Sequence, residues 1–523
     1  MPFIPSPQQH NFLDWAQNGS GSCVLEAVAG AGKTTTVLGA VDRMPGQHAI
    51  LAYNRKIAEE IGGKLKSAGY DFRKAQAGTV HSFGFSAFRK EFPNVRIEGD
   101  KVGKIADELI APPGLEDAGV GLGEYRSVIV KLVSLAKQRA LGVIERFGDD
   151  DRWLDIIEHF GLLDECEVEL DEDQEHPVAA IIEKAKEIMR TSNRDTATID
   201  FDDMVYLPLL YKVRFWKFDV VMVDEAQDTN PARRALVRAL VKKGGRVIAV
   251  GDRHQAIYGF TGADSDSLDL IAEDFNCVRM PLTVTYRCPK AVVAFAQQWV
   301  SHIEAHESAP EGKVSEIDMQ GFLSLADMGA GDAVLCRNTK PLVALAFALI
   351  RRRIPCRVEG KDIAARLKSF TKRWKVRSIE DFVGRLDAYF ERQMTKLLAA
   401  KQEAQLQALE DCVETLKVVA AQCLEEGKTR MSDLLAFLDD LFGDDVTDVL
   451  VLSTIHKSKG REWPRVFWLD RAGTCPSRWA RQGWQKEQEN NLCYVAATRA
   501  QSILIDLLAP EPAQAAEPRQ QAA

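Results

Sequence analysis

The first residues that could do chemistry form a run of small side chains ending in a lysine and a threonine. Ala27-Val28-Ala29-Gly30-Ala31-Gly32-Lys33-Thr34 follows the apolar pair Val24-Leu25 and fits the pattern G-x-x-x-x-G-K-[ST], with Ala27 in place of the first glycine. Small residues let backbone N–H groups curl around phosphates at a helix N-terminus. Lys33 would neutralise the β- and γ-phosphates, and the Thr34 hydroxyl would ligate Mg²⁺. The run predicts a site for Mg-ATP.

A pair of acidic residues follows a second apolar run. Asp224 and Glu225 come directly after Val220–Val223. A site that hydrolyses a triphosphate needs a carboxylate near the metal and a group that activates the attacking water. Asp224 would hold Mg²⁺ through water, and Glu225 would be the general base. Such a pair alone is more often a loop start or a helix cap, but the phosphate-binding run upstream favours catalysis.

Two longer strings resemble the UvrD/Rep/PcrA helicases of superfamily one. They are Asp224-Glu225-Ala226-Gln227-Asp228 and Gly251-Asp252-Arg253-His254-Gln255-Ala256-Ile257-Tyr258-Gly259-Phe260-Thr261-Gly262-Ala263. The resemblance continues in order along nearly the whole chain, except in two charged helical segments and the tail. It implies two RecA-like motor domains that close on ATP, open after hydrolysis and so step along one DNA strand.

The resemblance also assigns residues to the nucleotide. Gln9 takes the place of the glutamine that reads the adenine edge with its amide, and Tyr286 that of a tyrosine that packs on adenine. Thr35 departs from the pattern, since many relatives have an arginine beside the adenine there. Glu462 takes the place of a glutamate that accepts from the ribose hydroxyl. The predicted nucleotide-binding set is Gln9, Ala29, Gly30, Ala31, Gly32, Lys33, Thr34, Thr35, Tyr286, Arg287, Gly460, Glu462 and Arg499.

The remaining catalytic roles are implied in the same way. Gln255 would sense the γ-phosphate, and Arg287 and Arg499 would reach it from the second motor domain. Two guanidinium groups stabilise the charge on the transferring phosphoryl group. The predicted catalytic set is Lys33, Asp224, Glu225, Gln255, Arg287 and Arg499, and the predicted metal ligands are Thr34 and Asp224.

Several strings are similar to DNA-contacting segments of these helicases. They supply hydroxyl, amide and aromatic groups suited to a single-strand backbone and to base stacking. Phe260 stands where the family usually has Trp, so it offers less stacking area. Asp200-Phe201-Asp202-Asp203 recurs in these proteins as a structural element and receives no chemistry. The predicted DNA-contacting residues are Tyr53, Asn54, His81, Tyr258, Phe260, Thr454 and His456.

Short apolar runs must position these side chains. Each ends in, or is followed directly by, a small or polar residue and has helical sequence around it, which predicts buried parallel strands with sites at their carboxyl ends. Between them, Leu406–Leu424 carries apolar residues at helical spacing and predicts core packing. The runs are Val24–Ala27, Ala49–Tyr53, Val220–Val223, Val247–Val250, Ala333–Cys336, Val449–Ser453 and Val466–Leu469.

The predicted fold class is α/β, with two RecA-like P-loop NTPase motor domains that have parallel sheets and that are each interrupted by a mainly helical insertion. The first motor domain is expected in two parts, and so is the second. The predicted segments are 1–90 (first motor domain, with the phosphate loop), 91–190 (acidic helical insertion), 191–280 (first motor domain), 281–362 (second motor domain), 363–445 (compact helical insertion), 446–508 (second motor domain) and 509–523 (disordered tail).

Composition limits the environment and the partners. The chain has 523 residues, 46% hydrophobic and 27% charged, and its ten cysteines are scattered singly, which indicates neither a disulfide framework nor a zinc site. No apolar run is long enough for a membrane span, and no secretory signal begins the sequence, so a cytoplasmic protein without a membrane partner is expected.

The net charge of -9 is unevenly distributed. Residues 145–175 hold 14 acidic and 2 basic residues, a balance of -12, so the rest of the chain sums to +3. Residues 351–377 hold 11 basic and 2 acidic residues, a balance of +9, with Phe370 and Trp374 among them. This basic stretch is either a nucleic-acid surface or a solvated face. The acidic stretch is either a solvated face or a contact for a basic partner.

The predicted function is an ATP-dependent 3′-to-5′ single-strand DNA translocase and DNA helicase that serves DNA repair, recombination, replication or anti-phage defence. The polarity rests on the resemblance. The alternative is an ATPase subunit or a nucleotide-gated nucleic-acid switch that works with a nuclease or another partner and does not unwind processively alone. The expected cofactors are ATP and Mg²⁺. The expected partners are single-stranded DNA, single/double-strand junctions and a protein loader or nuclease, and the chain is expected to be monomeric.

Overall fold

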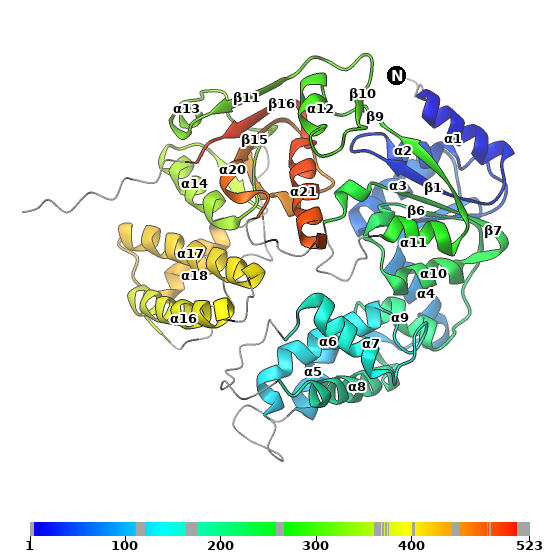
Figure 1. Cartoon of the computed structure of the whole chain (residues 1–523), viewed down its shortest axis with the longest axis horizontal. Helices are drawn as coiled ribbons and strands as arrows, with labels where there is room; N and C mark the ends of the chain where they lie inside the picture. The colour runs from blue at the N-terminus through cyan, green and yellow to red at the C-terminus, as the bar shows by residue number, and fades with distance from the viewer. Residues whose placement is uncertain are drawn as a thin grey trace, which may run out of the picture. The chain divides into compact units, whose positions relative to one another are not determined.

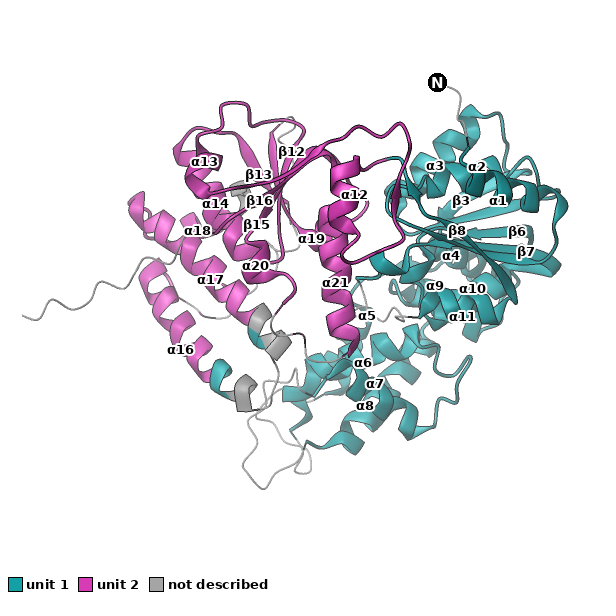
Figure 2. Ribbon diagram, turned by 45° about the horizontal axis from the view of Figure 1, so that its top comes forward, with its two compact units in different colours: residues 1–286, 393–406 teal, residues 287–392, 407–523 magenta. Residues whose placement is uncertain are grey.

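The chain folds into two compact units (Figure 2). The first comprises residues 1–286 and 393–406, and the second comprises residues 287–392 and 407–523. The computed structural model describes residues 5–110, 121–163, 176–257, 266–359, 368, 371, 374, 376–399, 403–441, 449–477, 480 and 483–509. None of the helices in these ranges is long and apolar enough to cross a membrane.

The first unit contains a six-stranded parallel sheet with the order β3-β2-β6-β7-β1-β8 (Figure 1). β2 is buried at every residue, as expected for a central strand with helices on both faces. The carboxyl ends of all six strands lie at one edge, where the loops carry the predicted site residues. The strands are β1 (Ser22–Ala27), β2 (His48–Ala52), β3 (Ala75–Thr79), β6 (Phe218–Val223), β7 (Val241–Gly251) and β8 (Cys277–Leu282).

Helices connect these strands. α1 begins with a capping box in which Ser6 Oγ accepts from the Gln9 backbone N–H and the Gln9 side chain accepts from the Ser6 N–H. This reciprocal pair fixes where α1 starts and places Gln9. The elements are α1 (Pro7–Asn18), α2 (Lys33–Gly39), α3 (Arg55–Ser67), α4 (Val80–Glu91), α9 (Asp203–Leu210), η2 (Ala226–Asp228), α10 (Pro231–Leu240), η3 (Arg253–Gln255) and α11 (Ser267–Asp274).

A helical segment follows α4 and shares a hydrophobic core with α4 and α9. Ile129, Leu132 and Trp153 are fully buried in that core together with Phe88 of α4 and Leu207 of α9. The segment is therefore anchored to the first unit by apolar packing. Its elements are β4 (Arg96–Ile97), α5 (Lys101–Leu109), η1 (Leu122–Tyr125), α6 (Arg126–Gln138), α7 (Asp150–Phe160), α8 (Val178–Arg194) and β5 (Thr198–Ile199), which pairs with β4.

The second unit contains another six-stranded parallel sheet, with the order β11-β16-β15-β12-β14-β13. Two parallel sheets with connecting helices confirm the predicted α/β class. The strands are β11 (Lys313–Ile317), β12 (Asp332–Cys336), β13 (Cys356–Val358), β14 (Leu450–Thr454), β15 (Trp463–Leu469) and β16 (Ala500–Leu507). The short strands β9 (Val284–Thr285) and β10 (Glu304–Ala305) lie outside the two large sheets.

Three helices, α16 (Ile379–Ala399), α17 (Glu403–Glu425) and α18 (Met431–Leu441), pack into the core of the second sheet. Phe382, Val413 and Leu434 of these helices belong to one buried cluster with Val334 and Leu452 of the strands. This confirms the core role predicted for the apolar residues of 406–424. The other helices are α12 (Lys290–Ala296), α13 (Met319–Leu323), α14 (Thr339–Arg351), α19 (Ile455–Ser458), α20 (Arg471–Thr474) and α21 (Gly483–Ala497).

The boundary expected between residues 280 and 281 differs from the one observed. β8 pairs with β1 as far as Leu282, so the break would cut through a hydrogen-bonded strand. The first compact unit continues to Tyr286.

Candidate nucleotide site

The phosphate-binding run forms the turn between β1 and α2. β1 ends at Ala27 and α2 begins at Lys33. Gly30 and Gly32 have φ angles of 72° and 73°, in the left-handed region that glycine adopts without a Cβ penalty. Gly32 is the N-cap of α2, so the backbone N–H groups of the turn lie at a helix N-terminus, where anions bind favourably.

The Lys33 ammonium lies at this turn without a hydrogen-bond partner among the described residues. Its Nζ is buried and has no hydrogen-bond partner within the described part of the chain. A buried ammonium without a hydrogen-bond acceptor is costly, so its environment favours an incoming anion. The position of Lys33 at the start of α2 makes a phosphate group the fitting ligand.

Asp224 faces this turn from the end of β6. Its carboxyl is 8% exposed and accepts a hydrogen bond from the Thr34 side chain. Burial, followed by the nearby Glu225 charge, raises the pKa of Asp224 to about 7, while the Lys33 charge acts in the opposite direction. Asp224 and Thr34 are hard oxygen ligands in direct contact, which is the donor set that Mg²⁺ prefers. The two residues predicted to hold the metal therefore fit it.

Glu225 has an unusual backbone conformation, and its side chain is joined to a buried relay of hydrogen bonds. Its φ and ψ are 49° and 46°, a left-handed region that costs a non-glycine residue about 1–2 kcal/mol. Gln227 Nε2 donates to Glu225 Oε2 at 2.5 Å, and Gln227 Oε1 accepts from the Asp252 N–H at 3.1 Å. Gln255 Nε2 donates to Asp252 Oδ2 at 2.7 Å. The relay thus joins the predicted base to the predicted phosphate sensor.

Gln227 and Asp252 have no role among the sequence predictions. Both are almost fully buried, at 1% and 3% exposure. A Cβ at position 251 would lie 2.5 Å from Gln227 Oε1, so only glycine at this position leaves room for the Gln227 amide. A sequence signal that could have identified these two residues is that polar residues follow both β6 and β7, which are neighbouring strands in the sheet.

Replacing Gln227 with alanine is expected to lower the maximal rate of ATP hydrolysis about tenfold, because a buried hydrogen bond left unmade costs ~1–3 kcal/mol. Glu225 would lose its donor, while the phosphate-binding turn keeps its contacts. Steady-state kinetics should therefore show a lower kcat with an unchanged KM for ATP. Gln298→Ala, which removes an exposed amide bonded to Phe295 O, is the matched control. Equal kcat values for the two variants would contradict this role.

Gln9 and Tyr286 lie beside the phosphate turn. Gln9 Nε2 donates to Thr36 Oγ1 at 2.8 Å and to Ala31 O at 3.3 Å, and Tyr286 donates its hydroxyl to Gln9 Oε1 at 3.2 Å. Tyr286 is 41% exposed, so part of its ring is open to a ligand. The Gln9 amide is engaged by the protein on both ends, and an adenine edge would have to exchange with one of these partners. Its role stays a prediction.

The predicted nucleotide residues of the second unit contact one another. Arg287 Nε donates to Glu462 Oε2, and Gln501 Nε2 donates to Glu462 Oε1 at 2.8 Å. Arg499 is 1% exposed and donates to the carbonyl oxygens of Val495 and Arg461 at 2.9 and 3.1 Å. Both guanidinium groups are thus held by protein oxygens, and their contact with a γ-phosphate stays a prediction.

The predicted DNA-contacting residues of the first unit follow the carboxyl ends of β2 and β3. Burial, followed by the Asp228 charge, raises the pKa of Tyr53 to about 12, which keeps the phenol neutral. Asn54 is exposed and caps α3 by accepting from the Ile57 N–H at 2.9 Å. Burial, followed by the Arg233 charge, lowers the pKa of His81 to about 4, so its ring is neutral at pH 7. These groups would meet DNA as polar, uncharged contacts.

The remaining predicted DNA contacts divide into two groups. Thr454 caps α19, and burial followed by the Arg337 charge lowers the pKa of His456 to about 3. These two residues follow the carboxyl end of β14, which is the corresponding edge of the second sheet. Tyr258 and Phe260 lie outside the described residues.

About half of the basic stretch 351–377, including Phe370, lies outside the described residues. Trp374 is described, and its ring packs 5.8 Å from Phe382 and 5.6 Å from Tyr389, against the core of the second unit. For Trp374, this packing favours neither of the two alternatives for the stretch, because the ring is partly buried against the core. Arg357 is paired with Glu359 at 3.2 Å.

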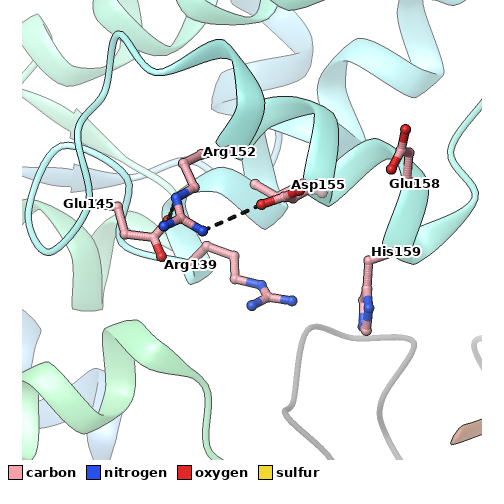
Figure 3. A pocket seen from close by; sticks show the side chains of 7 residues that line it. Arg139, Glu145, Arg152, Asp155, Glu158 and His159 are labelled. Carbon is pink, nitrogen blue, oxygen red and sulfur yellow. Dashed lines mark hydrogen bonds and ion pairs between the residues drawn. The ribbon is translucent and has the colours of Figure 1, made fainter.

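A cavity of about 500 Å³ lies on the helical segment of the first unit (Figure 3). Arg152 pairs there with Glu145 at 3.9 Å and with Asp155 at 3.4 Å. Because these charges largely compensate one another, the cavity has no strong preference for a triphosphate. The full charged lining is Arg139, Glu145, Arg152, Asp155, Glu158 and His159.

The fold and the first-unit site define a P-loop NTPase. A parallel sheet leads from β1 into a phosphate-binding turn, and an acidic pair lies at the end of β6, two strands away. The model of the UvrD/REP helicase N-terminal domain family matches residues 8–276, and that of the UvrD-like helicase C-terminal domain family matches residues 361–508. The chain belongs to the UvrD/Rep helicase family.

Individual relatives are similar at low identity. The probable DNA helicase II homolog of Mycoplasma pneumoniae is 27% identical over 56% of this chain and 42% of its own length. The ATP-dependent DNA helicase Rep of Salmonella typhimurium is 27% identical over 53% of this chain and 40% of its own. F-box DNA helicase protein 1 of Schizosaccharomyces pombe is 22% identical over 92% of this chain and 55% of its own. The chain spans about half the length of the curated relatives it matches.

Proposed function

We propose that the chain is an ATP-dependent DNA helicase that translocates 3′ to 5′ along a single strand. The observation that carries the proposal is the phosphate turn, where the Lys33 ammonium is buried without a hydrogen-bond partner in the described part of the chain, beside the Asp224–Thr34 contact. The names of the relatives, which include an ATP-dependent DNA helicase, support the choice of ATP and DNA. The 3′-to-5′ polarity is supported by the resemblance of the string from Ile257 to Ala263.

Different residues of the first unit perform different steps of ATP hydrolysis. Lys33 and the N–H groups at the start of α2 bind the phosphates and neutralise their charge. Thr34 and Asp224 would hold Mg²⁺, which supplies charge stabilisation at the phosphoryl oxygens. Glu225 accepts the proton of the attacking water, and the Gln227 amide fixes the carboxylate that receives it.

The relay from Glu225 to Gln255 supports coupling between hydrolysis and movement. Asp252 and Gln255 are 3% and 4% exposed, so a change at one end of this buried relay must be accommodated along it. Loss of the γ-phosphate would change the contact of Gln255. The string that follows Gln255 contains Tyr258 and Phe260, the predicted base-stacking residues, and would transmit that change to DNA.

Single-stranded DNA is expected to raise the ATPase rate of the chain severalfold. The reason is that the predicted DNA contacts Tyr53 and His81 follow strands β2 and β3 of the sheet that carries the phosphate turn. Steady-state hydrolysis with poly-dT, with poly-rU and without nucleic acid measures the effect and the preference for DNA. A rate that is the same in all three conditions would refute the translocase.

Strand displacement separates the helicase from the alternative, a nucleotide-gated switch or an ATPase subunit. One observation favours the alternative: α16, α17 and α18 pack into the core of the second sheet. A 3′-tailed duplex should be unwound and a 5′-tailed duplex should not. DNA-stimulated hydrolysis without displacement of either duplex would favour the switch, and one partner that co-purifies in equal amount would favour the subunit.

A further inference from the structure

The amino-terminal edge of the first sheet carries two exposed aromatic rings. β2, β3 and β6 are neighbours there, with His48 of β2 in register with Ala75 and Val220. Phe72, which precedes β3, is 66% exposed, and Trp216, which precedes β6, is 60% exposed. Single exposed apolar residues are common, but two large rings at one edge indicate a contact surface.

Gln47 holds the segments that carry the two rings. Its Oε1 accepts from Trp216 Nε1 at 2.7 Å, and its Nε2 donates to the Phe72 carbonyl at 2.8 Å. Gln76 Nε2 donates to the same carbonyl at 3.0 Å. Because the indole N–H is the only polar group of tryptophan and is already bonded, Trp216 offers a partner its ring face. The bonds fix the segments. The Trp216 ring remains open, and the Arg73 guanidinium lies 5.7 Å from the centre of the Phe72 ring, so a base can stack on the other face of Phe72.

The same edge is basic in a chain that is acidic overall. Residues 71–74, 214–219 and 242–243 contain six basic and two acidic residues, a balance of +4 against -9 for the whole chain. Arg214 and Lys217 flank Trp216, are exposed, and have no ion-pair partner among the residues that the structure describes. We call Phe72, Arg73, Arg214, Trp216 and Lys217 the amino-edge surface.

This surface is distant from the nucleotide site. The phosphate turn, Tyr53 and His81 all follow the carboxyl ends of strands in the same sheet. β2 has five residues, and at ~3.3 Å per residue it separates the two edges by about 17 Å. A ligand on the amino-edge surface therefore belongs neither to the ATP site nor to the predicted DNA contacts.

We propose that the amino-edge surface binds a second segment of single-stranded nucleic acid, with bases stacked on Phe72 and Trp216 and phosphates neutralised by Arg73, Arg214 and Lys217. Bases stack on exposed ring faces and phosphates bind to nearby cations, and this surface offers both groups. A peptide partner would instead insert its own aromatic anchors into pockets lined by the surface. The amino-edge surface would then be a second nucleic-acid-binding site of the chain, and binding there would not depend on translocation.

The number of short strands bound per chain tests the proposal. Oligo-dT of about eight nucleotides, within the size range of single-strand sites, is titrated into the full chain and followed by calorimetry. Wild type should show a binding step on the amino-edge surface. The double variant Phe72→Ala with Trp216→Ala should bind in this step with an affinity lower by about fivefold or more for each ring removed, which is the effect of losing one base–aromatic stack. The matched control is Phe201→Ala, which removes another ring of 60% exposure. ATP hydrolysis without DNA should be equal in all three proteins.

Charge variants and crosslinking identify the ligand. Arg214→Glu with Lys217→Glu keeps both rings and should reduce the slope of log affinity against log salt by about 0.7 for each lost phosphate contact. An iododeoxyuridine oligonucleotide should crosslink to peptides that contain Phe72 or Trp216. Identical binding steps in wild type and the double-ring variant, without crosslinks at either ring, would overturn the proposal. Saturation by polyglutamate but not by oligo-dT would also overturn it and would assign the surface to an acidic protein.

Discussion

Replacing Glu225 with glutamine is expected to lower the rate of ATP hydrolysis by about 10²- to 10⁴-fold, the contribution typical of a positioned general base. Glutamine has the same shape but cannot accept the proton of the attacking water. Its amide oxygen can still accept from Gln227 Nε2, so the relay and the left-handed backbone of residue 225 should persist. ATP affinity should therefore be unchanged, because Lys33 and the start of α2 remain intact.

Two measurements on purified protein check this expectation. Phosphate release with and without single-stranded DNA gives the rate, and titration with a fluorescent ATP analogue gives the affinity. Glu273→Gln, on the exposed face of α11, is the matched control and should behave as wild type. Hydrolysis by Glu225→Gln within a factor of a few of the control would remove Glu225 as the base. A loss of nucleotide binding would show instead that the substitution disturbs the turn.

The strands predicted from sequence are those at which both faces of the sheet are covered. All seven predicted runs are present, as β1, β2, β6, β7, β12, β14 and β15. Strands covered on both faces are apolar at nearly every residue, and this produces the signal. In the two large sheets, the strands that were not predicted are the edge strands β3, β8, β11 and β13 and one interior strand, β16 (Ala500–Leu507), whose buried residues are interspersed with exposed or partly exposed ones. An edge strand such as Lys-Val-Ser-Glu-Ile has solvent beside it and needs no apolar run.

The candidate site was predictable where its residues are adjacent in sequence and was not where the fold brings distant residues together. Lys33 and Thr34 form one string, and Asp224 and Glu225 another; the phosphate-binding run indicated the chemistry of the first string, and its presence upstream favoured catalysis for the second. The bond from Gln227 to the Asp252 N–H depends on the parallel pairing of β6 with β7, which no local pattern encodes. The pairing of Arg287 with Glu462 joins residues 175 positions apart. Tertiary contacts of this kind require the structure.

A buried cluster of ion pairs gives the recurring Asp200–Asp203 string a physical role. Lys137 Nζ lies 2.7 Å from Asp203 Oδ1 and 2.9 Å from Asp200 Oδ2, and Lys101 Nζ lies 2.8 Å from Asp203 Oδ2. Burial lowers the pKa of Lys137, but Asp203 and Asp200 together raise it above its usual value, so the ammonium stays charged. Two lysines on α5 and α6 thus balance two aspartates at the start of α9.

Replacing Asp203 with asparagine is expected to destabilise the first unit by about 3–5 kcal/mol, the effect of removing one partner from a buried ion pair. Asp203 is 0% exposed, and its carboxylate contacts both lysines, so Asp200 alone would have to balance two buried cations. The loss should concentrate in α5, α6 and α9, the three helices that the cluster joins. Hydrogen exchange of these helices in the full chain, together with urea unfolding, measures it.

Asp107→Asn is the matched control, because it removes an exposed carboxylate that pairs with Arg126 on the same helical segment. Exposed pairs contribute ~0–1 kcal/mol, so the control should exchange and unfold nearly as wild type does. Equal protection of α5 and α6 in the two variants would show that the cluster does not stabilise the segment. Because the cluster contains no predicted nucleotide ligand, Asp203→Asn should retain ATP binding at temperatures where it remains folded. A variant that is folded but has lost ATP binding would mean that the cluster acts on the nucleotide site directly.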